Sequence, residues 1–355
     1  MSLIISNDCI KFSILIPSYN RPQYLKQTIQ SILNSSYLNF ELLISDDNSP
    51  LIEDIISIVN SFDFSIPFKF YRQKYNLGPT GNKNFLVNNA CGEYVILLGD
   101  DDLLDSNILN CLNSEIVRNN DKFSIYGFGY NIIDENNSRV GYYKSFKSLV
   151  IENENKLINK FFFDGDILPF YFFHPFTICY KRSINITYKN EAHIGYDFLF
   201  LYESILNNQC IKVLPTIGFS WRKAQNPGLY QNLSNVKSND LISRIGIYKF
   251  FFNNASFTSR LNFVLPVDHI CTFLGNTILL DEKLILEHLK LLKDNLSSEE
   301  YNKISSYVNS NMVRLLVLFN KFFRCLQLQG FLSLHYFSIR LKNILIRKIS
   351  LKNNI

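Results

Sequence analysis

Residues 76–104 read NLGPTGNKNFLVNNACGEYVILLGDDDLL, and this stretch decides the fold. It opens with a turn at 76–79, and residues 80–90 carry the pattern of a helix. A short apolar run at 94–98 indicates a buried strand, and three aspartates follow it at 100–102. A helix that leads into a buried strand ending in carboxylates is typical of an α/β sheet.

The same alternation of strand and helix begins upstream of this stretch. Strands separated by helices of about a dozen residues imply βαβ crossovers, so we expect an α/β fold with a mainly parallel sheet flanked by helices. The expected strands are 12–16, 40–45, 67–72, 94–98, 123–130, 177–180 and 211–221, and the expected helices are one from Pro22 and others at 51–59, 80–90, 105–117 and 196–206.

The composition excludes several classes of protein. Of the 355 residues, 47% are hydrophobic and 19% are charged, which excludes general disorder. The seven cysteines are scattered singly without a C-x-x-C pair, so we expect reduced thiols rather than a zinc site or a disulfide framework. No apolar run is long enough to span a bilayer and the N-terminus lacks a signal-peptide pattern, so we expect a cytoplasmic protein.

The net charge of +5 is the sum of opposite charges on two unlike regions. No Asp or Glu follows Glu300, whereas nine Lys and Arg residues do, which leaves residues 1–300 with a net charge of −4. From about residue 232 the sequence pattern turns helical. We therefore predict a first domain at 1–230 and a helical C-terminal region with a basic tail at 231–355.

The basic tail carries the pattern of an amphipathic helix. Arg314, Lys321 and Arg324 share one helical face, and apolar residues between 312 and 326 share another. Such a helix either packs on the first domain with its charges in water or docks on an anionic membrane surface, where each basic residue contributes on the order of 1 kcal/mol. No nucleic-acid-binding motif accompanies the charge, so nucleic acid is not an expected partner.

Polar clusters follow several of the predicted strands. In open α/β sheets ligands bind outside the carboxyl ends of the strands, and the clusters at 17–21, 46–49 and 100–102 all fall there. Three adjacent carboxylates repel one another unless a cation lies among them, and hard oxygen ligands suit Mg²⁺ or Mn²⁺ that also holds phosphates. The alternative for 100–102 is a solvated turn that caps the next helix.

The remaining clusters offer contacts to a nucleotide. Tyr19 can stack on a nucleobase, and Arg21 can meet a phosphate. Asp46 and Asp47 can accept hydrogen bonds from a base or a ribose. Lys83 opens a helix, where the positive dipole end and an ammonium together favour phosphate. In each case an ordinary loop or a helix cap is the alternative.

Taken together, the clusters resemble glycosyltransferase family 2, whose members have the GT-A fold. The resemblance covers residues 10–222 and rests on FSILIPSYNRPQYLKQTIQSIL, FELLISDDNS, the opening stretch at 76–104 and GYDFLFLYESIL. In the family, the first two segments bind the nucleoside, and the acidic motif after GEY holds a divalent metal on the diphosphate. A later acidic residue deprotonates the acceptor hydroxyl.

The resemblance implies roles for single residues. Asp101 and Asp102 are the implied ligands of Mn²⁺ or Mg²⁺, and Asp197 is the implied general base, with Glu191 and Glu203 as alternatives. The side chains that could line the acceptor site are His174, His193 and Trp221. The implied contacts of the nucleotide sugar are Pro17, Tyr19, Asn20, Arg21, Asp46, Asp47, Lys83, Asp100 and Arg222.

The implied activity is that of an inverting glycosyltransferase. It moves one sugar from a nucleoside-diphosphate sugar to a glycan acceptor, with an undecaprenyl-diphosphate-linked one expected, at the inner face of the cytoplasmic membrane. The product would be a cell-surface polysaccharide such as O-antigen, lipopolysaccharide or capsule, and the L-G-D-D-D variant is similar to that of abequosyltransferases.

Two alternatives stay open. A sugar nucleotidyltransferase shares the architecture, although IPSYNRP lacks the Gly-rich loop of that class. Departures from the family pattern at Gly99, Lys83 and Tyr196 leave room for a sugar-nucleotide-binding protein without catalysis.

Overall fold

The computed structural model describes residues 9–144, 148–151, 176–190, 196–207 and 209–223, with a few residues between 290 and 302. The chain forms two compact units. The first comprises Met1–Glu154, Leu168–Tyr188 and Phe200–Asn226, and the second comprises Asn155–Ile167, Lys189–Leu199 and Pro227–Ile355. The predicted boundary at residue 230 and the basic tail lie outside the described residues.

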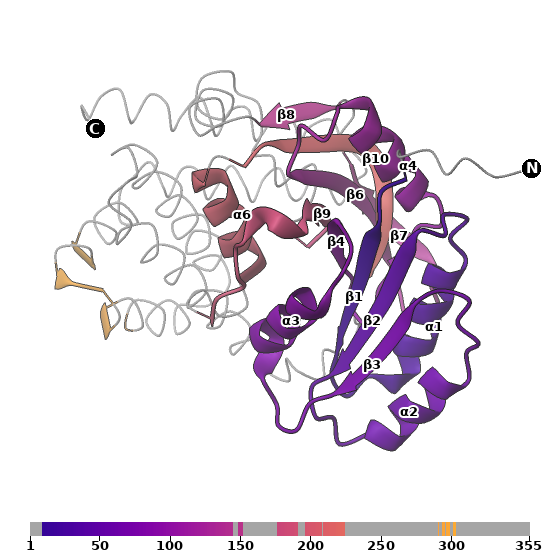
Figure 1. Cartoon of the computed structure of the whole chain (residues 1–355). Coiled ribbons are helices and arrows are strands. Elements are labelled where there is room, and N and C mark those ends of the chain that lie inside the picture. Colours follow the sequence, from indigo (N-terminus) through magenta and orange to yellow (C-terminus); the bar gives the residue numbers. More distant parts are fainter. Residues whose placement is uncertain are drawn as a thin grey trace, which may run out of the picture. The chain divides into compact units, whose positions relative to one another are not determined.

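The first unit is built on a ten-stranded sheet in the order β3-β2-β1-β4-β9-β6-β10-β5, with β7 and β8 attached to β6 and β10. Four neighbouring strands are parallel, as predicted (Figure 1). Their bounds are β1 Phe12–Ser18, β2 Phe40–Asp46, β3 Phe68–Arg72 and β4 Tyr94–Leu97.

The other half of the sheet is mixed rather than parallel. Strand β9 runs antiparallel between β4 and β6, while β10 runs parallel to β6. The predicted strands all exist, but an apolar run does not specify the direction in which a strand enters a sheet. The bounds are β5 Leu103–Leu104, β6 Ile125–Ile133, β7 Arg139–Tyr143, β8 Leu149–Ile151, β9 Ile178–Lys181 and β10 Ile211–Arg222.

Helices cover both faces of the parallel strands. Figure 1 shows α1 and α2 on one face and α3 on the other. Leu25, Ile29 and Ile32 are fully buried, so the predicted apolar stripe of the first helix is the one that packs on the sheet. The bounds are α1 Pro22–Leu33, α2 Ile52–Asn60, α3 Gly78–Asn89, α4 Ile108–Arg118 and α6 Tyr196–Leu206, with a 3₁₀ turn at Arg182–Ile184.

The register brings the predicted polar clusters to one edge. Ile14 of β1 pairs with Leu42 of β2 on one side and Ile96 of β4 on the other, and all three are fully buried. Because these strands are parallel, Ser18, Asp46 and the residues after β4 reach the same carboxyl edge. The predicted convergence of the clusters is therefore confirmed.

The chain that follows β4 is anchored a second time. After residues 98–102, which we call the acidic turn, β5 pairs antiparallel with β10, and the Asp105 amide donates to the Gly218 carbonyl at 2.8 Å. The acidic turn is therefore fixed at both ends by strands of the same sheet.

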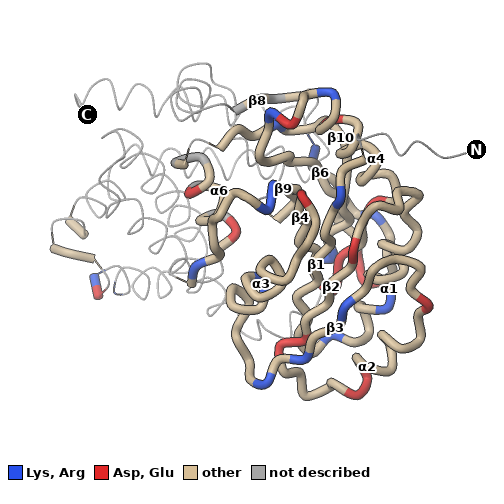
Figure 2. Tube along the Cα trace, viewed as in Figure 1, with Lys and Arg blue, Asp and Glu red and all other residues tan. Residues whose placement is uncertain are grey.

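Charges of both signs are interspersed over the described part of the chain (Figure 2). Among the same residues, no helix is both long and apolar enough to cross a bilayer.

Gly92 provides a test of the sheet packing. A Cβ there would lie 2.6 Å from the Phe12 carbonyl carbon and from the Ser13 nitrogen, which are backbone atoms that cannot move aside. We expect Gly92→Ala to lower the free energy of unfolding by about 1–3 kcal/mol in urea denaturation, because the backbone must shift.

The matched control is Gly141→Ala in β7, where the nearest atom to a Cβ is Ile132 Cδ1 at an ordinary 3.5 Å. We expect this change to alter the free energy of unfolding by no more than about 0.5 kcal/mol. Equal losses in the two variants would contradict the close packing at Gly92.

Candidate nucleotide-sugar site

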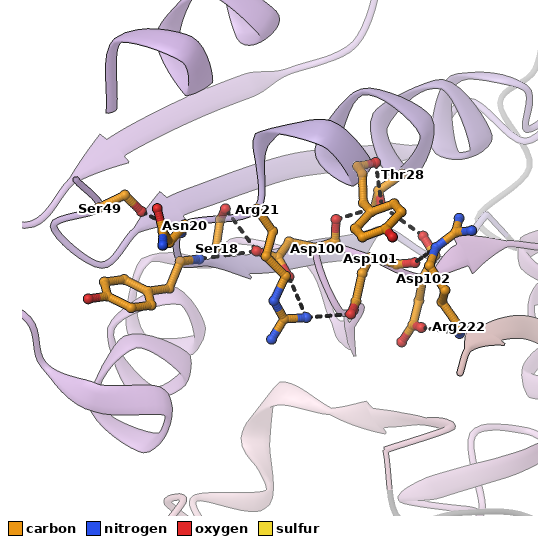
Figure 3. Close-up of polar contacts among 11 residues, drawn as sticks. Ser18, Asn20, Arg21, Thr28, Ser49, Asp100, Asp101, Asp102 and Arg222 are labelled. Carbon is orange, nitrogen blue, oxygen red and sulfur yellow. Dashed lines mark hydrogen bonds and ion pairs between the residues drawn. The ribbon is translucent and has the colours of Figure 1, made fainter. Parts of the chain in front are cut away.

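The acidic turn is the centre of the candidate site (Figure 3). The Asp100 carboxylate is only 4% exposed. Its Oδ2 accepts hydrogen bonds from the Ser18 hydroxyl and the Tyr19 amide, both at 3.1 Å. Asp100 is thus tied to the end of β1. A sugar nucleotide that contacts this carboxylate would have to do so alongside these two hydrogen bonds.

Arg21 supplies the positive charge on the more open side of the turn. Its Nη1 lies 3.3 Å from Asp100 Oδ1 and pairs closely with Asp101 Oδ2. The Asp101 side chain is 22% exposed and that of Arg21 is 36% exposed. Of the three aspartates, Asp101 is therefore the carboxylate most accessible to a ligand.

The backbone of the acidic turn is held from α1. The Thr28 hydroxyl, which is fully buried, lies 3.0 Å from the Asp100 carbonyl oxygen and 2.8 Å from that of Asp102. One turn further along the helix, the Ser31 hydroxyl accepts the Leu104 amide at 3.0 Å. The polar face of α1 thus fixes the turn while its apolar face packs on the sheet.

Gly99 leaves room for two carboxylates to converge. A Cβ at this position would lie 2.8 Å from Asp102 Oδ2 and 3.1 Å from Asp101 Oδ1. Two hard oxygen donors beside one open space fit Mg²⁺ or Mn²⁺, which keeps several ligands from water and phosphate. Among the described residues no group of three or more His, Cys, Asp or Glu side chains could close a metal site. The donor chemistry of Asp101 and Asp102 is nevertheless that of ligands for such an ion.

Burial sets the protonation of the acidic turn. Desolvation raises the pKa of Asp100 to about 6, against the lowering effect of Arg21. Desolvation, followed by the charge of Asp101, raises the pKa of Asp102 as well, although the Arg222 amide donates to it. Without a further cation, the buried pair resists full ionisation.

The predicted base-side contacts are held by a network of their own. Asp46 is fully buried and accepts hydrogen bonds from the amide and hydroxyl of Ser49, whose hydroxyl also accepts the Asn20 amide at 2.8 Å. Asp47 Oδ1 accepts the Leu77 amide at 2.7 Å. Burial raises the pKa of Asp47, against the lowering effect of that amide.

These contacts lock the loops that follow β1 and β2 against each other. Asn20 and Asn48 have φ of 58° and 62°, a left-handed conformation that Asn tolerates. Tyr19 follows β1 and is 41% exposed, so its ring is accessible for stacking on a nucleobase. Pro17 pairs with Ser45 inside the sheet. These predicted contacts therefore share one rim of the sheet.

Lys83 and Trp221 are both packed against aromatic rings. The Lys83 ammonium lies 5.1 Å from the ring centroid of Tyr188, and the residue is 9% exposed. The Trp221 ring lies 6.4 Å from that of Tyr130 and 6.3 Å from that of Phe176. Their predicted contacts with phosphate and acceptor stay predictions.

Arg222 lies on the side of the acidic turn away from Arg21 (Figure 3). It is 3% exposed, and its amide donates to Asp102 Oδ1 at 3.0 Å. Its guanidinium is engaged inside the protein, so the predicted diphosphate contact would require those interactions to break.

The predicted acceptor side is not assembled by these contacts. Asp197 lies in the first turn of α6 and belongs to the second unit, so its role as general base stays a prediction. Glu203 lies further along the same helix. The candidates His174 and His193, and the alternative base Glu191, lie outside the described residues.

Sequence reasoning missed the residues that hold the aspartates in place. Tyr24, Gln27, Thr28 and Ser31 lie at positions i, i+3, i+4 and i+7, so their polar side chains share one face of α1. That polar stripe, beside the apolar one, was the available signal. Ser18 carried a weaker signal, since it adjoins Tyr19 in the quoted loop.

Solved structures share the fold of this chain. The structure superposes on residues 1–349 of S. aureus TarS in complex with UDP-GlcNAc with a TM-score of 0.58 and 16% identity, covering 97% of this chain and 92% of that chain. Mannosyltransferase PcManGT from Pyrobaculum calidifontis, in complex with GDP-Man and Mn²⁺, gives 0.50 and 9%, covering 94% and 87%. These likenesses show the fold, and the predicted GT-A fold is confirmed.

The family follows from the sequence match. The model of glycosyl transferase family 2 matches residues 13–187, so this part of the chain belongs to that family. The predicted membership is confirmed.

Two curated relatives carry more specific names. GalNAc(5)-diNAcBac-PP-undecaprenol beta-1,3-glucosyltransferase of Campylobacter jejuni is 32% identical over 51% of this chain and 57% of its own length. UDP-Glc:alpha-D-GlcNAc-diphosphoundecaprenol beta-1,3-glucosyltransferase WfgD of Escherichia coli is 35% identical over 36% of this chain and 49% of its own. The chain thus matches about half the length of these relatives, and the abequosyltransferase subtype stays a prediction.

The raised pKa values predict how stability depends on pH in metal-free protein. Because Asp100 and Asp102 bind protons more tightly when folded than when unfolded, stability is lost as pH rises from about 4 through the raised values. We expect Asp102→Asn, with a chelator present, to raise the melting temperature relative to wild type, and the gain to grow between about pH 5 and pH 8.

The control is Asp63→Asn, which removes an exposed carboxylate outside the site. Its melting temperature should follow that of wild type at every pH. A gain for Asp102→Asn that shrinks as pH rises would contradict the electrostatic account.

Proposed function

We propose that this chain is a metal-dependent glycosyltransferase that moves one sugar from a UDP-sugar to an undecaprenyl-diphosphate-linked glycan. The observation that carries the proposal is the acidic turn, with Asp101 accessible and two carboxylate oxygens converging beside Gly99 at the edge that also holds Tyr19 and Asp47. The names of the two curated relatives support the acceptor class, and WfgD supports the uridine nucleotide and a hexose.

The residues of this chain divide the work of binding the donor. Tyr19, Asn20 and Asp47 form the rim for the nucleoside, and Arg21 offers a guanidinium to the diphosphate from the accessible side of the turn. Asp101 and Asp102 would hold Mg²⁺ or Mn²⁺. When bound, such an ion neutralises the charge that develops on the departing diphosphate.

The proposed chemistry is a single inverting displacement. The acceptor hydroxyl oxygen forms a bond to the anomeric carbon while the bond from that carbon to the diphosphate oxygen breaks. The hydroxyl proton passes to the Asp197 carboxylate, which acts as general base. The product would enter a cell-surface polysaccharide such as O-antigen, lipopolysaccharide or capsule.

A nucleotide panel tests this proposal. We expect UDP with Mn²⁺ to raise the melting temperature more than GDP, CDP or dTDP with Mn²⁺, because a ligand stabilises the fold it occupies. We also expect Asp101→Asn to remove the effect of Mn²⁺, and Asp197→Asn to lower transfer about 10²–10⁴-fold with UDP binding unchanged.

The matched control for the base is Glu203→Gln, an acidic residue on the same helix. Transfer by this variant should stay near the wild-type rate. Loss of transfer in Glu203→Gln together with full activity of Asp197→Asn would move the base role to Glu203. A wild-type protein that binds none of the four nucleotides would contradict the proposed function.

We further propose that the basic tail brings the enzyme to its lipid-linked acceptor by docking on the anionic inner leaflet. Arg314, Lys321 and Arg324 share a helical face in the sequence, and an undecaprenyl-linked acceptor lies in the membrane. The protein would then be a cytoplasmic enzyme attached peripherally to the membrane.

Vesicle sedimentation of the full chain tests the docking. Replacing Arg314, Lys321 and Arg324 with Gln should weaken binding to phosphatidylglycerol vesicles by on the order of a hundredfold, at about 1 kcal/mol per charge. The control replaces three exposed lysines of the first unit, Lys26, Lys69 and Lys122. Equal partitioning of the two triple variants would contradict the role of the tail.

A further inference from the structure

The guanidinium of Arg222 uses all of its hydrogen-bond donors within the protein. A guanidinium carries five N–H groups, and here each has a partner inside the protein. Nε donates to the Asp101 carbonyl at 2.9 Å. Nη1 donates to the carbonyls of Asp134 at 2.9 Å and Glu135 at 3.3 Å. Nη2 donates to Gln27 Oε1 at 3.0 Å and Asn137 Oδ1 at 2.7 Å.

All five acceptors are neutral carbonyl or amide oxygens, and the face of the guanidinium is also covered. Its central carbon lies 4.6 Å from the ring centroid of Tyr24, at a distance typical of a cation–π contact. With 3% exposure and no uncommitted N–H, the guanidinium offers no donor to a diphosphate unless an existing contact breaks.

These contacts join four segments that are far apart in the sequence. Arg222 ends β10, Gln27 belongs to α1, Asp101 to the acidic turn, and residues 134–137 form the turn between β6 and β7. The Arg222 amide completes the set by donating to Asp102 Oδ1. One residue therefore holds the backbone of Asp101 and the carboxylate of Asp102 together.

The turn at 134–137 is shaped to receive the guanidinium. Asp134 Oδ1 accepts the amides of Asn136 at 2.9 Å and Ser138 at 2.8 Å, and Asn137 has a left-handed φ of 64°. The Asp134 carbonyl accepts the Asn137 amide at 3.2 Å as well as the guanidinium, and the Glu135 carbonyl accepts from the guanidinium beside it. The turn therefore presents three acceptor oxygens to the planar guanidinium of Arg222.

We propose that Arg222 is a positioning residue that fixes the acidic turn against α1 and the 134–137 turn, instead of a contact for the donor diphosphate. The inference rests on the proposed function only for its consequence, which is that Asp101 and Asp102 are held ready for a divalent ion. Its structural part concerns the metal-free protein alone.

The experiment compares Arg222→Lys, Arg222→Gln and Gln27→Ala by hydrogen–deuterium exchange of the full chain without metal. A lysine keeps the charge but cannot reproduce a five-donor fork, so a positioning role makes Arg222→Lys nearly as damaging as Arg222→Gln. We expect amides of residues 99–105 and 134–138 to exchange at least tenfold faster in both variants, and to a smaller degree in Gln27→Ala. Amides of β1 should be unchanged.

Lys212→Gln is the matched control, because Lys212 is also a buried cation of β10 but pairs with Glu115 at 2.8 Å, on α4. We expect its acidic turn to exchange at the wild-type rate. Exchange at 99–105 that stays at the wild-type rate in Arg222→Lys would overturn the proposal. Faster exchange over the whole chain in the Arg222 variants, β1 included, leaves Gln27→Ala to decide, and an unchanged acidic turn there would also overturn it.

Titration with Mn²⁺ then separates the two roles. A positioning residue predicts that Arg222→Lys binds Mn²⁺ at least tenfold more weakly, even without nucleotide. A diphosphate contact predicts that Arg222→Lys binds Mn²⁺ alone like wild type and loses affinity only for UDP, and this result would overturn the proposal. A wild-type protein that binds neither Mn²⁺ nor UDP would contradict the proposed function, while the exchange result would still decide the structural part.

Discussion

The burial of two carboxylates in the acidic turn, those of Asp100 and Asp102, is the constraint on which the first unit depends. Asp100 and Asp102 are 4% and 6% exposed, and a buried carboxylate without partners is strongly destabilising. The protein offsets this with donors from several elements, namely the hydroxyl of Ser18, the amides of Tyr19 and Arg222 and the guanidinium of Arg21. The arrangement of β1, β10 and α1 around the acidic turn is what makes these donors available.

The same constraint explains why the site and the core cannot be separated. Strand β4 enters the sheet beside β1. The two residues that follow the acidic turn form β5 and pair with β10. Helix α1 serves both purposes, because Leu25 and Ile29 pack on the sheet while Thr28, on the adjoining face, holds the turn. A polar substitution on either face of α1 would therefore disturb binding and folding together, although through different contacts.

The sequence allowed prediction of the elements and of the edge where they meet, but not of the direction of every strand. Short apolar runs bounded by turn residues predict β1 to β4, and their parallel direction follows from the helices between them. Strand β9 enters antiparallel, and no local pattern encodes that choice. The acidic residues were recognisable from their type, whereas Thr28 and the five contacts of Arg222 depend on long-range packing. The family resemblance implied that Arg222 contacts the nucleotide sugar, and the sequence could not show that its N–H groups are already engaged by residues of three other segments.

The two arginines give the acidic turn two unlike sides. On one side, Arg222 is buried and all its N–H groups have acceptors, which fits the proposed role of holding the aspartates in place. Arg21, with 36% of its side chain exposed, pairs with Asp101, which is itself 22% exposed. An exposed ion pair exchanges partners at little cost, because water and the incoming ligand replace what is lost. A divalent ion with a diphosphate supplies both replacements, a cation for Asp101 and an anion for Arg21. If the proposed function holds, we expect a charged donor to enter from the side of the turn that carries Arg21, because the contacts that keep Asp100 and Asp102 buried can then stay intact.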